Sequence, residues 1–246
     1  MSATGALDSK NPAASCPVEG DCSLKTLCKC MRSLGLKSPQ RISLSKYDLL
    51  YRNVTAMDNI YVLLDGLWAV MTNDSEGNVT SWGVFGKGST IGESEYFLPN
   101  IDNYIVQALT GCTVCKFSSR DLGELDFDDP LILREIIRAS TLNQGVFCKH
   151  VWIMHPVQLS ERINRLFLAL YPYGSKEGGY VSLGLSHSDI AGLVNAERSA
   201  VTHAMKKLSD DGRLVLGYGK VMLNPAYFDI IEDPSRYPYP TWRHVS

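Results

Sequence analysis

The sequence predicts an α+β fold, in which a strand-rich region is followed by helices and does not alternate with them. Three observations support this prediction. Short apolar runs separated by turn residues fill residues 39–127 and favour a small barrel or roll, with a hairpin expected at Asp65-Gly66. A long helical pattern follows over residues 128–155. Residues 156–231 then hold a helical stretch from Ser160 to Tyr171, two short helical patterns and a hairpin, which together predict a winged helix-turn-helix.

The helix-turn-helix itself is predicted from residues 186–212. Ser186 and Asp189 have the spacing of a helix N-terminus, because a hydroxyl can cap unpaired N–H groups and an acid suits the helix dipole. Asn195 lies at the expected break, and Gly212 at the end of the second helix. Apolar residues repeat at helical spacing on both helices: Ile190, Leu193 and Val194 on the first, and Val201, Ala204, Met205 and Leu208 on the second.

The opposite face of the second helix is polar. Five side chains there are short or basic enough to reach base edges or phosphates from a major groove: Arg198, Ser199, Thr202, His203 and Lys206. Residues 213–223 predict a hairpin turning at Gly217–Gly219, which would form a wing beside this helix. A solvated amphipathic helix pair is the alternative, and the wing and the upstream chain favour DNA binding over it.

Charge and composition restrict the class of protein. The formal net charge is −2, yet residues 156–224 hold eight Lys/Arg against six Asp/Glu, an excess of the sign that phosphate binding needs. The sequence has neither an apolar run of the ~18–20 residues that a membrane helix needs nor a secretory signal, so a cytoplasmic protein is expected. Paired catalytic carboxylates, a glycine-rich phosphate loop and Ser/His/Asp spacing are missing, so an enzyme is not predicted.

Residues 1–38 are expected to form a flexible arm that carries cysteines. Four thiols lie within fifteen residues, which suits a soft metal better than disulfides in a reducing compartment: Cys16, Cys22, Cys28 and Cys30. Their spacing is not that of a zinc ribbon, and unrelated reduced thiols are the alternative. Cys112 and Cys115 form a C-x-x-C, but residues three apart on a strand face opposite ways. We therefore expect one to pack inside and the other to point outward as a lone ligand.

The helix expected over residues 128–155 begins at Pro130 and ends before Pro156, the expected hinge. Its apolar residues recur every seven positions, with further residues in companion positions: Ile132, Ala139, Val146 and Ile153, with Ile136, Asn143 and His150. This pattern predicts a dimeric coiled-coil seam of moderate strength, because polar insertions weaken a pair and fix its register. A helix packed on its own domain is the alternative. The tail, residues 232–246, is expected to be disordered.

The order of roll, long helix, hinge and winged helix-turn-helix over residues 20–231 resembles the CRP/FNR family of bacterial transcription regulators. The segments GDCSLKTLC (20–28) and QALTGCTVCKFSSRDLGEL (107–125) are similar to the oxygen-sensing fumarate–nitrate reduction branch, whose members hold a [4Fe–4S] cluster. The resemblance implies a roll of the cyclic-nucleotide-binding type and a homodimer that binds promoter DNA and RNA polymerase. It also implies that loss of the cluster reverses dimerisation and DNA binding.

The resemblance also suggests cluster ligands. Three cysteines match ligand positions of that branch: Cys22, Cys28 and Cys115. The remaining N-terminal position holds Glu19, so we expect Cys16 to serve instead, with Cys30 as the second choice. Cys148 would only pack within its helix. In the reading helix Arg198 matches a DNA-contacting arginine, whereas Ser199 and His203 replace the usual base-reading residues, so a different half-site is expected.

Cyclic AMP is not an expected ligand. Ile91-Gly92-Glu93 resembles the Gly-Glu element of nucleotide-binding members, but those members hold the phosphate with a downstream Arg-Ser pair. Here no Lys or Arg occurs between Ile101 and Cys115, and a buried phosphate without a cation is costly. Glu93 is therefore interpreted as a turn acid. Alternative sensors are haem with a bound gas or a small effector in the roll, and a zinc-stabilised interaction protein is the alternative from another class.

Overall fold

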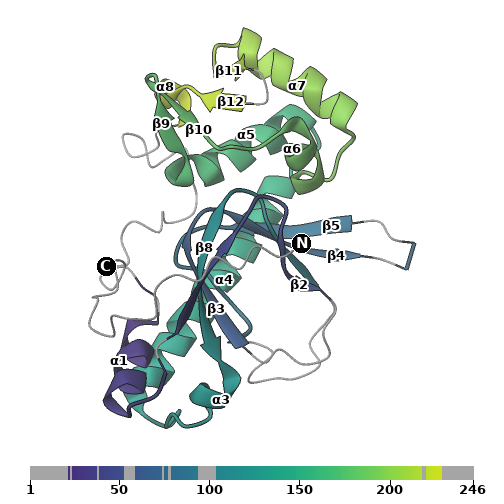
Figure 1. Ribbon diagram of the computed structural model, residues 1–246. Helices are drawn as coiled ribbons and strands as arrows, with labels where there is room; N and C mark the ends of the chain where they lie inside the picture. The colour runs from purple at the N-terminus through teal and green to yellow at the C-terminus, as the bar shows by residue number, and fades with distance from the viewer. Residues whose placement is uncertain are drawn as a thin grey trace, which may run out of the picture.

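The computed structural model describes residues 22, 24–37, 39–52, 59–73, 75–76, 79–93, 104–217 and 220–228. It confirms the α+β fold, with an N-terminal β-roll, a long helix and a C-terminal helix-turn-helix (Figure 1). Cys16, Glu19, the tip of the wing at 218–219 and the tail at 232–246 lie outside the described residues.

Two antiparallel sheets build the roll, with strand orders β1-β8-β3-β6 and β2-β7-β4-β5. Trp68 and Phe85 are fully buried between them, as apolar side chains on the inner faces of paired sheets should be. The elements are β1 (Gln40–Leu44), β2 (Leu49–Arg52), β3 (Asn59–Asp65), β4 (Trp68–Asn73), β5 (Val79–Phe85), β6 (Thr90–Ile91), β7 (Ile105–Ala108), β8 (Cys112–Ser118) and the short helix α3 (Ser119–Leu122).

The hairpin expected at Asp65-Gly66 is wrong, although a turn is present there. β3 pairs with β8 and β6, whereas β4 pairs with β5 and β7, so this turn carries the chain from one sheet to the other. Gly66 has φ +94°, and a Cβ on it would collide with the carbonyl oxygen of Gly111. The turn signal is local, but the partner of each strand is chosen by distant residues, which explains the error.

A helix, α1 (Lys25–Ser33), occupies part of the arm that was expected to be flexible. Leu24, Leu27 and Met31 are buried against the roll and the first half of the long helix. The carboxylate of Glu135 accepts hydrogen bonds from the backbone N–H groups of Thr26 (2.8 Å) and Leu27 (3.0 Å). These N–H groups have no partner within the helix, so the carboxylate caps α1 and ties it to the long helix. The apolar spacing i, i+3, i+7 is the signal that could have predicted α1.

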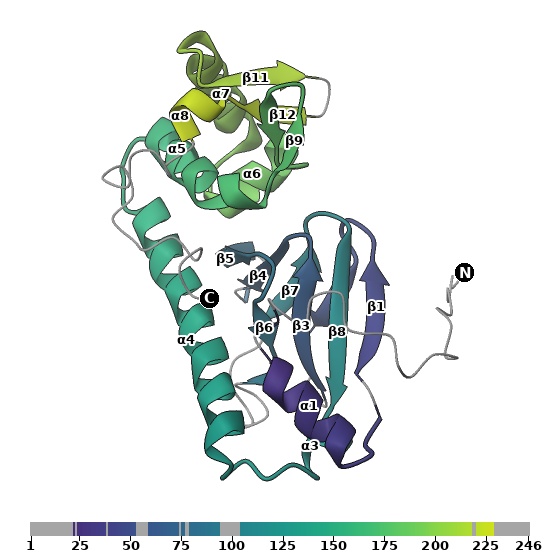
Figure 2. The same cartoon turned by 90° about the vertical axis from the view of Figure 1, so that its left-hand side faces the viewer.

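The long helix, α4 (Pro130–Met154), has the expected bounds. The Asp129 side chain accepts from the N–H of Leu131 (2.8 Å), and Pro130 occupies the first helical position, where its missing N–H costs nothing. With 25 residues, α4 is about 37 Å long. It runs along the roll and reaches the C-terminal part of the chain (Figure 2).

The C-terminal part packs α5, α6, α7 and the short α8 against a four-stranded sheet of order β11-β12-β10-β9. The pairing of Gly217 with Lys220 confirms the wing hairpin, whereas β9 and β10 were not predicted. Their turn, Gly178-Gly179, has positive φ at both residues, which is the two-glycine hairpin signal that the sequence offered. The elements are α5 (Leu159–Leu170), the 3-10 turn η1 (Tyr171–Tyr173), β9 (Ser175–Glu177), β10 (Tyr180–Ser182), α6 (His187–Leu193), α7 (Arg198–Asp210), β11 (Leu214–Gly217), β12 (Lys220–Leu223) and α8 (Pro225–Phe228).

Candidate nucleic-acid interface and sensor sites

The helix pair α6–α7 forms as the sequence predicts. Ser186 caps α6, and its hydroxyl and the Asp189 carboxylate exchange hydrogen bonds with each other's backbone N–H (3.1 and 2.7 Å), a complete capping box. Asn195 has φ +50° at the break and Gly212 has φ +72° after α7. The predicted apolar faces of both helices are buried, which fixes the orientation of α7 on α5 and α6.

The opposite face of α7 is open to solvent. All five candidate DNA-binding residues are exposed and share this face: Arg198, Ser199, Thr202, His203 and Lys206. In both views α6 lies toward the roll and α7 lies beyond it, so the roll does not cover the face (Figures 1 and 2). The geometry required of a groove-reading helix is therefore present.

His187 belongs beside this face and was missed by the sequence analysis. Its Nδ1 lies 3.0 Å from the hydroxyl of Thr202, and that hydroxyl in turn donates to the carbonyl oxygen of Arg198 (3.0 Å). The Thr202 hydroxyl has one proton, so both contacts are hydrogen bonds at once only where the imidazole donates through Nδ1. The sequence signal that could have identified His187 is its position directly after Ser186, at the start of the first helix of the pair.

Several basic residues counted in the charge argument have internal roles. Arg162 donates to the carbonyl oxygen of Val194 (2.9 Å), Arg165 to that of Trp152 (2.8 Å), and Lys220 pairs with Glu177 (2.9 Å). Arg213 also bonds to Asn164 (3.1 Å). The positive charge offered to a nucleic acid is thus concentrated on α7 and is not spread over the C-terminal part.

A cavity of about 520 Å³ lies between the roll and α4. Its wall is aromatic: the ring centroids of Trp82 are 6.2 Å from Tyr104 and 6.3 Å from Phe147. The described residues that line it are Val70, Trp82, Phe85, Ile91, Gly92, Glu93, Tyr104, Ile136, Ile137, Ser140, Thr141, Asn143, Gln144 and Phe147. Glu93 is the one charged side chain among them. A cavity of this size and character suits a small organic ligand.

Glu93, which the sequence analysis interprets as a turn acid, is buried: it is 3% exposed and faces α4. The amide of Asn143 donates to its carboxylate, and also to the carbonyl oxygen of Thr90 (2.8 Å). Asn143 therefore joins α4 to the roll instead of facing a second chain. Burial could not be inferred from the Gly-Glu motif, since it depends on how α4 packs across the roll.

The coiled-coil seam predicted on α4 is also assigned to the wrong face. Ile132, Ile136, Ala139 and Ile153 are buried within the single chain, where they pack on the roll, on α1 and on the C-terminal core. The exposed residues lie on a different face, with alternating spacings of four and three: Leu133, Ile137, Ser140, Gln144, Phe147 and Val151, with the half-buried Met154 next in the series. We call this set the outer seam; it has the a/d spacing of a coiled coil.

The candidate metal ligands among the described residues lie at one end of the roll. Cys22, Cys28, Cys30 and Cys115 are half-buried and pack against the same apolar cluster around Phe117. Among the described residues, however, no three His, Cys, Asp or Glu side chains are grouped closely enough to hold a metal ion. Cys148 is exposed on α4.

The two cysteines of the C-x-x-C point to opposite faces of β8, as predicted. Cys112 is buried inside the roll, and burial raises the pKa of its thiol. Cys115 belongs to the cluster around Phe117, beside α1. The motif is therefore unsuited to thioredoxin-type chemistry, which needs a thiol of low pKa at a helix N-terminus.

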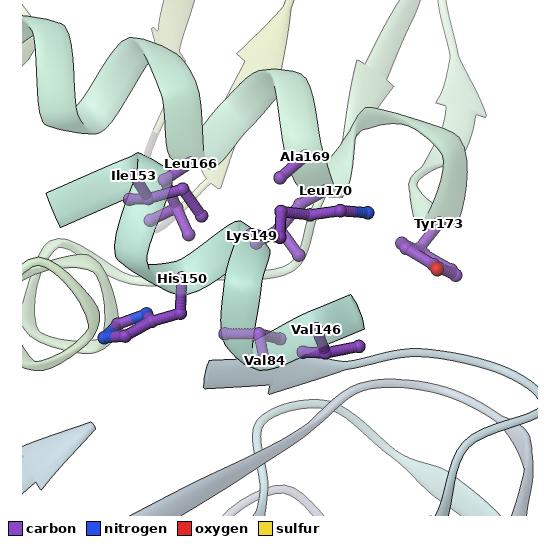
Figure 3. Close-up of a pocket in the computed structure, with 9 residues that line it drawn as sticks. All are labelled: Val84, Val146, Lys149, His150, Ile153, Leu166, Ala169, Leu170 and Tyr173. Carbon is purple, nitrogen blue, oxygen red and sulfur yellow. The ribbon is translucent and has the colours of Figure 1, made fainter. Parts of the chain in front are cut away.

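A small cavity marks the junction of α4, β5, α5 and η1, and Figure 3 shows Lys149 extended across it toward Tyr173. Burial lowers the pKa of Lys149 to about 8 and raises that of Tyr173 to about 12. Burial also lowers the pKa of His150, on the other side of the helix. The volume of this cavity, about 20 Å³, is enough for a water molecule but not for an organic ligand.

Sequence comparison identifies both halves of the chain. A model of the cyclic nucleotide-binding domain matches residues 41–128, and a model of the Crp-like helix-turn-helix domain matches residues 161–227. The transcriptional regulator SdrP of Thermus thermophilus is 27% identical over 180 residues, which cover 71% of this chain and 84% of SdrP.

Solved structures share the fold over most of this chain. TTHA1359, a CRP/FNR-family regulator from Thermus thermophilus, matches with TM-score 0.62 and 23% identity over 79% of this chain and 99% of its own. TTHB099, a CRP-family regulator from the same organism, matches with TM-score 0.65 and 20% identity over 76% and 94%. The c-di-GMP-responsive global regulator CLP of Xanthomonas campestris matches with TM-score 0.61 and 22% identity over 76% and 94%.

The fold, the exposed reading helix and these relatives define a DNA-binding transcription regulator with an N-terminal sensor domain, not an enzyme. The chain belongs to the CRP/FNR family. Regulators of this family bind DNA and act as dimers. Within the described residues, no helix is both long and apolar enough to span a membrane.

Proposed function

We propose that this regulator is a homodimer that binds promoter DNA through α7, and that a [4Fe–4S] cluster on its cysteine arm controls binding. The observation that carries DNA reading is the exposed polar face of α7, held by a capped helix-turn-helix whose apolar face is fully buried. RNA polymerase is the proposed protein partner of the DNA-bound dimer.

The proposed contacts follow from the chemistry of each side chain on that face. Arg198 begins α7 and can bond both acceptors of a guanine, whereas Lys206, two turns on, suits a phosphate. Three polar residues lie between Arg198 and Lys206 and can reach a base edge or a phosphate: Ser199, Thr202 and His203. His187 is added to the set because its bond to Thr202 orients that hydroxyl.

The outer seam is the proposed dimer interface. Leu133 (46% exposed), Ile137 (57%) and Val151 (68%) are too apolar and too well aligned to be left in water along one face of a 25-residue helix. The repeat of four and three residues matches what a second copy of α4 presents. Ser140 and Gln144 in the middle weaken the pair, which suits an association that must be reversible.

The cluster proposal rests on the placement of the thiols. Cys22, Cys28 and Cys115 converge on one apolar cluster although 93 positions separate the first from the last, and thiolates are the donors that iron–sulfur clusters require. Cys16 is the proposed fourth ligand, with Cys30 as the second choice. When bound, such a cluster would supply an oxygen-sensitive link between these cysteines. The capping of α1 by Glu135 would connect that link to the dimer helix.

Anaerobic purification followed by iron and sulfide analysis tests the cluster directly. We expect a brown protein with broad visible absorption that air bleaches. Cys22→Ser and Cys115→Ser should abolish the colour, and Cys148→Ser, an exposed thiol outside the group, is the matched control that should keep it. Equal iron in all three variants would reject these ligands, a sharp Soret band would indicate haem, and a colourless zinc protein would indicate a structural metal.

A small effector in the 520 Å³ cavity is the second candidate signal, and the cavity itself favours it. Glu93 is the only charged group among the described lining residues, so a neutral or cationic aromatic ligand fits better than a cyclic nucleotide. Tryptamine and indole-3-acetate, which share a ring and differ in charge, form a matched pair of probes. Tryptamine should raise the melting temperature, with Glu93→Gln abolishing the rise; equal shifts with both probes, or a shift with cyclic AMP, would reject this ligand class.

A further inference from the structure

The turn between β1 and β2 reaches across to the helix-turn-helix. Lys46 in this turn forms an ion pair with Asp189 of α6, with Nζ 2.8 Å from Oδ2, and donates a second hydrogen bond to the carbonyl oxygen of Gly184 (2.8 Å). The Asp189 side chain is only 6% exposed and that of Lys46 30% exposed. This contact joins residues 143 positions apart, one in the sensor domain and one in the DNA-binding domain.

The neighbouring residue holds the turn in an unusual conformation. Tyr47 has φ +72°, which is unfavourable for any residue with a Cβ and is maintained only where surrounding contacts enforce it. The N–H of Tyr47 donates to the carbonyl oxygen of Ala108 (2.7 Å), and the side-chain amide of Gln107 donates to the carbonyl oxygen of Tyr47 (3.2 Å). Its hydroxyl lies 3.5 Å from the same Asp189 oxygen. The strained turn thus places both side chains against α6.

Asp189 takes part both in this contact and in the cap of α6, the first helix of the helix-turn-helix. The oxygen that accepts from Lys46 also accepts from the N–H of Ser186 (2.7 Å) and so closes the capping box of α6. Burial by itself lowers the pKa of Lys46, but its hydrogen bond and charge pairing with Asp189, together with Tyr47, outweigh burial and raise it. The lysine therefore stays charged in this contact at neutral pH.

Apolar contacts surround the ion pair. Leu67, Ala69 and Leu109 of the roll belong to the same buried cluster as the core of the helix-turn-helix. By contrast, the covalent connection between α4 and α5 is short and exposed to solvent, with the Val157 side chain 96% exposed. The orientation of the DNA-binding domain thus depends on its contacts with the roll rather than on the connection.

We propose that Lys46 is a positioning residue for DNA recognition, which latches α6 to the sensor domain so that α7 faces away from it. Two reading helices of a dimer must enter successive major grooves at a fixed spacing, so a spread of domain orientations weakens binding without removing any DNA contact. This inference is independent of the iron–sulfur cluster and of the identity of the base contacts.

Lys46→Met tests the latch, because it keeps the aliphatic stem and removes the charge. The matched control is Lys37→Met, which removes one positive charge from an exposed position just before β1. With a duplex selected from a random library by the wild-type protein, we expect Lys46→Met to weaken binding about 5- to 10-fold, the effect of losing a partly buried ion pair. Hydrogen exchange at residues 184–190 should accelerate in Lys46→Met, and Lys46→Arg should restore both measurements.

A double-mutant cycle separates the latch from general damage. Asp189→Asn keeps an acceptor for the α6 cap. In that background Lys46→Met should lose much less DNA affinity than in the wild type, because only the hydrogen bond to Gly184 is left to remove. Additive losses in the cycle, or a Lys46→Met protein that matches Lys37→Met in affinity and exchange, would overturn the proposal. Tighter binding by Lys46→Met would overturn it too, since the contact would then restrain DNA binding.

Discussion

Arg198 is the residue on which sequence-specific recognition is expected to depend most. A bidentate contact with guanine contributes about 1–3 kcal/mol of discrimination, so Arg198→Ala should weaken binding to the selected duplex roughly 5- to 100-fold and relax selection at one base pair. Lys207→Ala is the control, because it removes an equal charge from the side of α7 facing away from Arg198. Competition titrations with single-base variants of the duplex measure both; equal losses in the two variants would indicate that Arg198 contacts only phosphate.

Lys149 makes stability depend on pH in a defined direction. Its folded pKa of about 8 lies below the ordinary value of 10.5, so between these values the unfolded chain binds more protons and stability rises with pH. Lys149→Met should remove this rise, on the order of 1–3 kcal/mol between pH 8 and 10.5, while leaving the slope below pH 7 unchanged. Denaturant unfolding of both proteins across this range measures the difference, and parallel curves would contradict it.

Residue-level signals predicted local structure well and burial poorly. The Ser186 cap, the turn at Asn195 and the opposite orientations of Cys112 and Cys115 depend on neighbours in the chain, and all three are confirmed. Glu93 and Lys149 are charged residues in apolar surroundings because α4 packs across them or carries them inward. No local sequence pattern identifies such positions, because the residue type is the same whether the charged side chain is buried or exposed.

At the scale of elements, the outer seam of α4 is the face that we propose to pair two copies of the chain. Ile137→Glu places a like charge on both helices of the proposed pair, and we expect it to convert the dimer to a monomer. Leu131→Glu is the matched control, because Leu131 is equally exposed but lies outside the seam. Sedimentation equilibrium measures both variants. A dimeric Ile137→Glu protein with an intact fold would place the interface elsewhere.

The choice of seam shows what periodicity cannot decide. Two faces of α4 repeat every seven residues, and the buried one contains the more regular aliphatic residues. The core of the roll selects that face, so the polar-interrupted face stays exposed in the single chain. Likewise, α1 and the β9–β10 hairpin have recognisable sequence signals. Both elements are short, so they depend on tertiary contacts for stability, and the sequence pattern alone predicts them weakly.

Across the whole molecule, α4 contacts every part that could carry a signal. Its first turns cap and bury α1, its middle closes the aromatic cavity, and its last turns line the junction with α5. Ile137 and Phe147 belong to both the cavity wall and the outer seam. Under the proposed function, a change at the cysteine arm or in the cavity would act on the residues proposed to pair two chains, and through them on the spacing of the two α7 helices.

The most direct test of this account is a fluorescence-anisotropy titration of the selected duplex with anaerobically purified protein, before and after air is admitted. The account predicts specific binding before exposure and a loss of affinity of at least about tenfold as the visible absorption disappears, because the dimer separates. Unchanged affinity after bleaching, or no preference for any duplex over random DNA in either state, would contradict it.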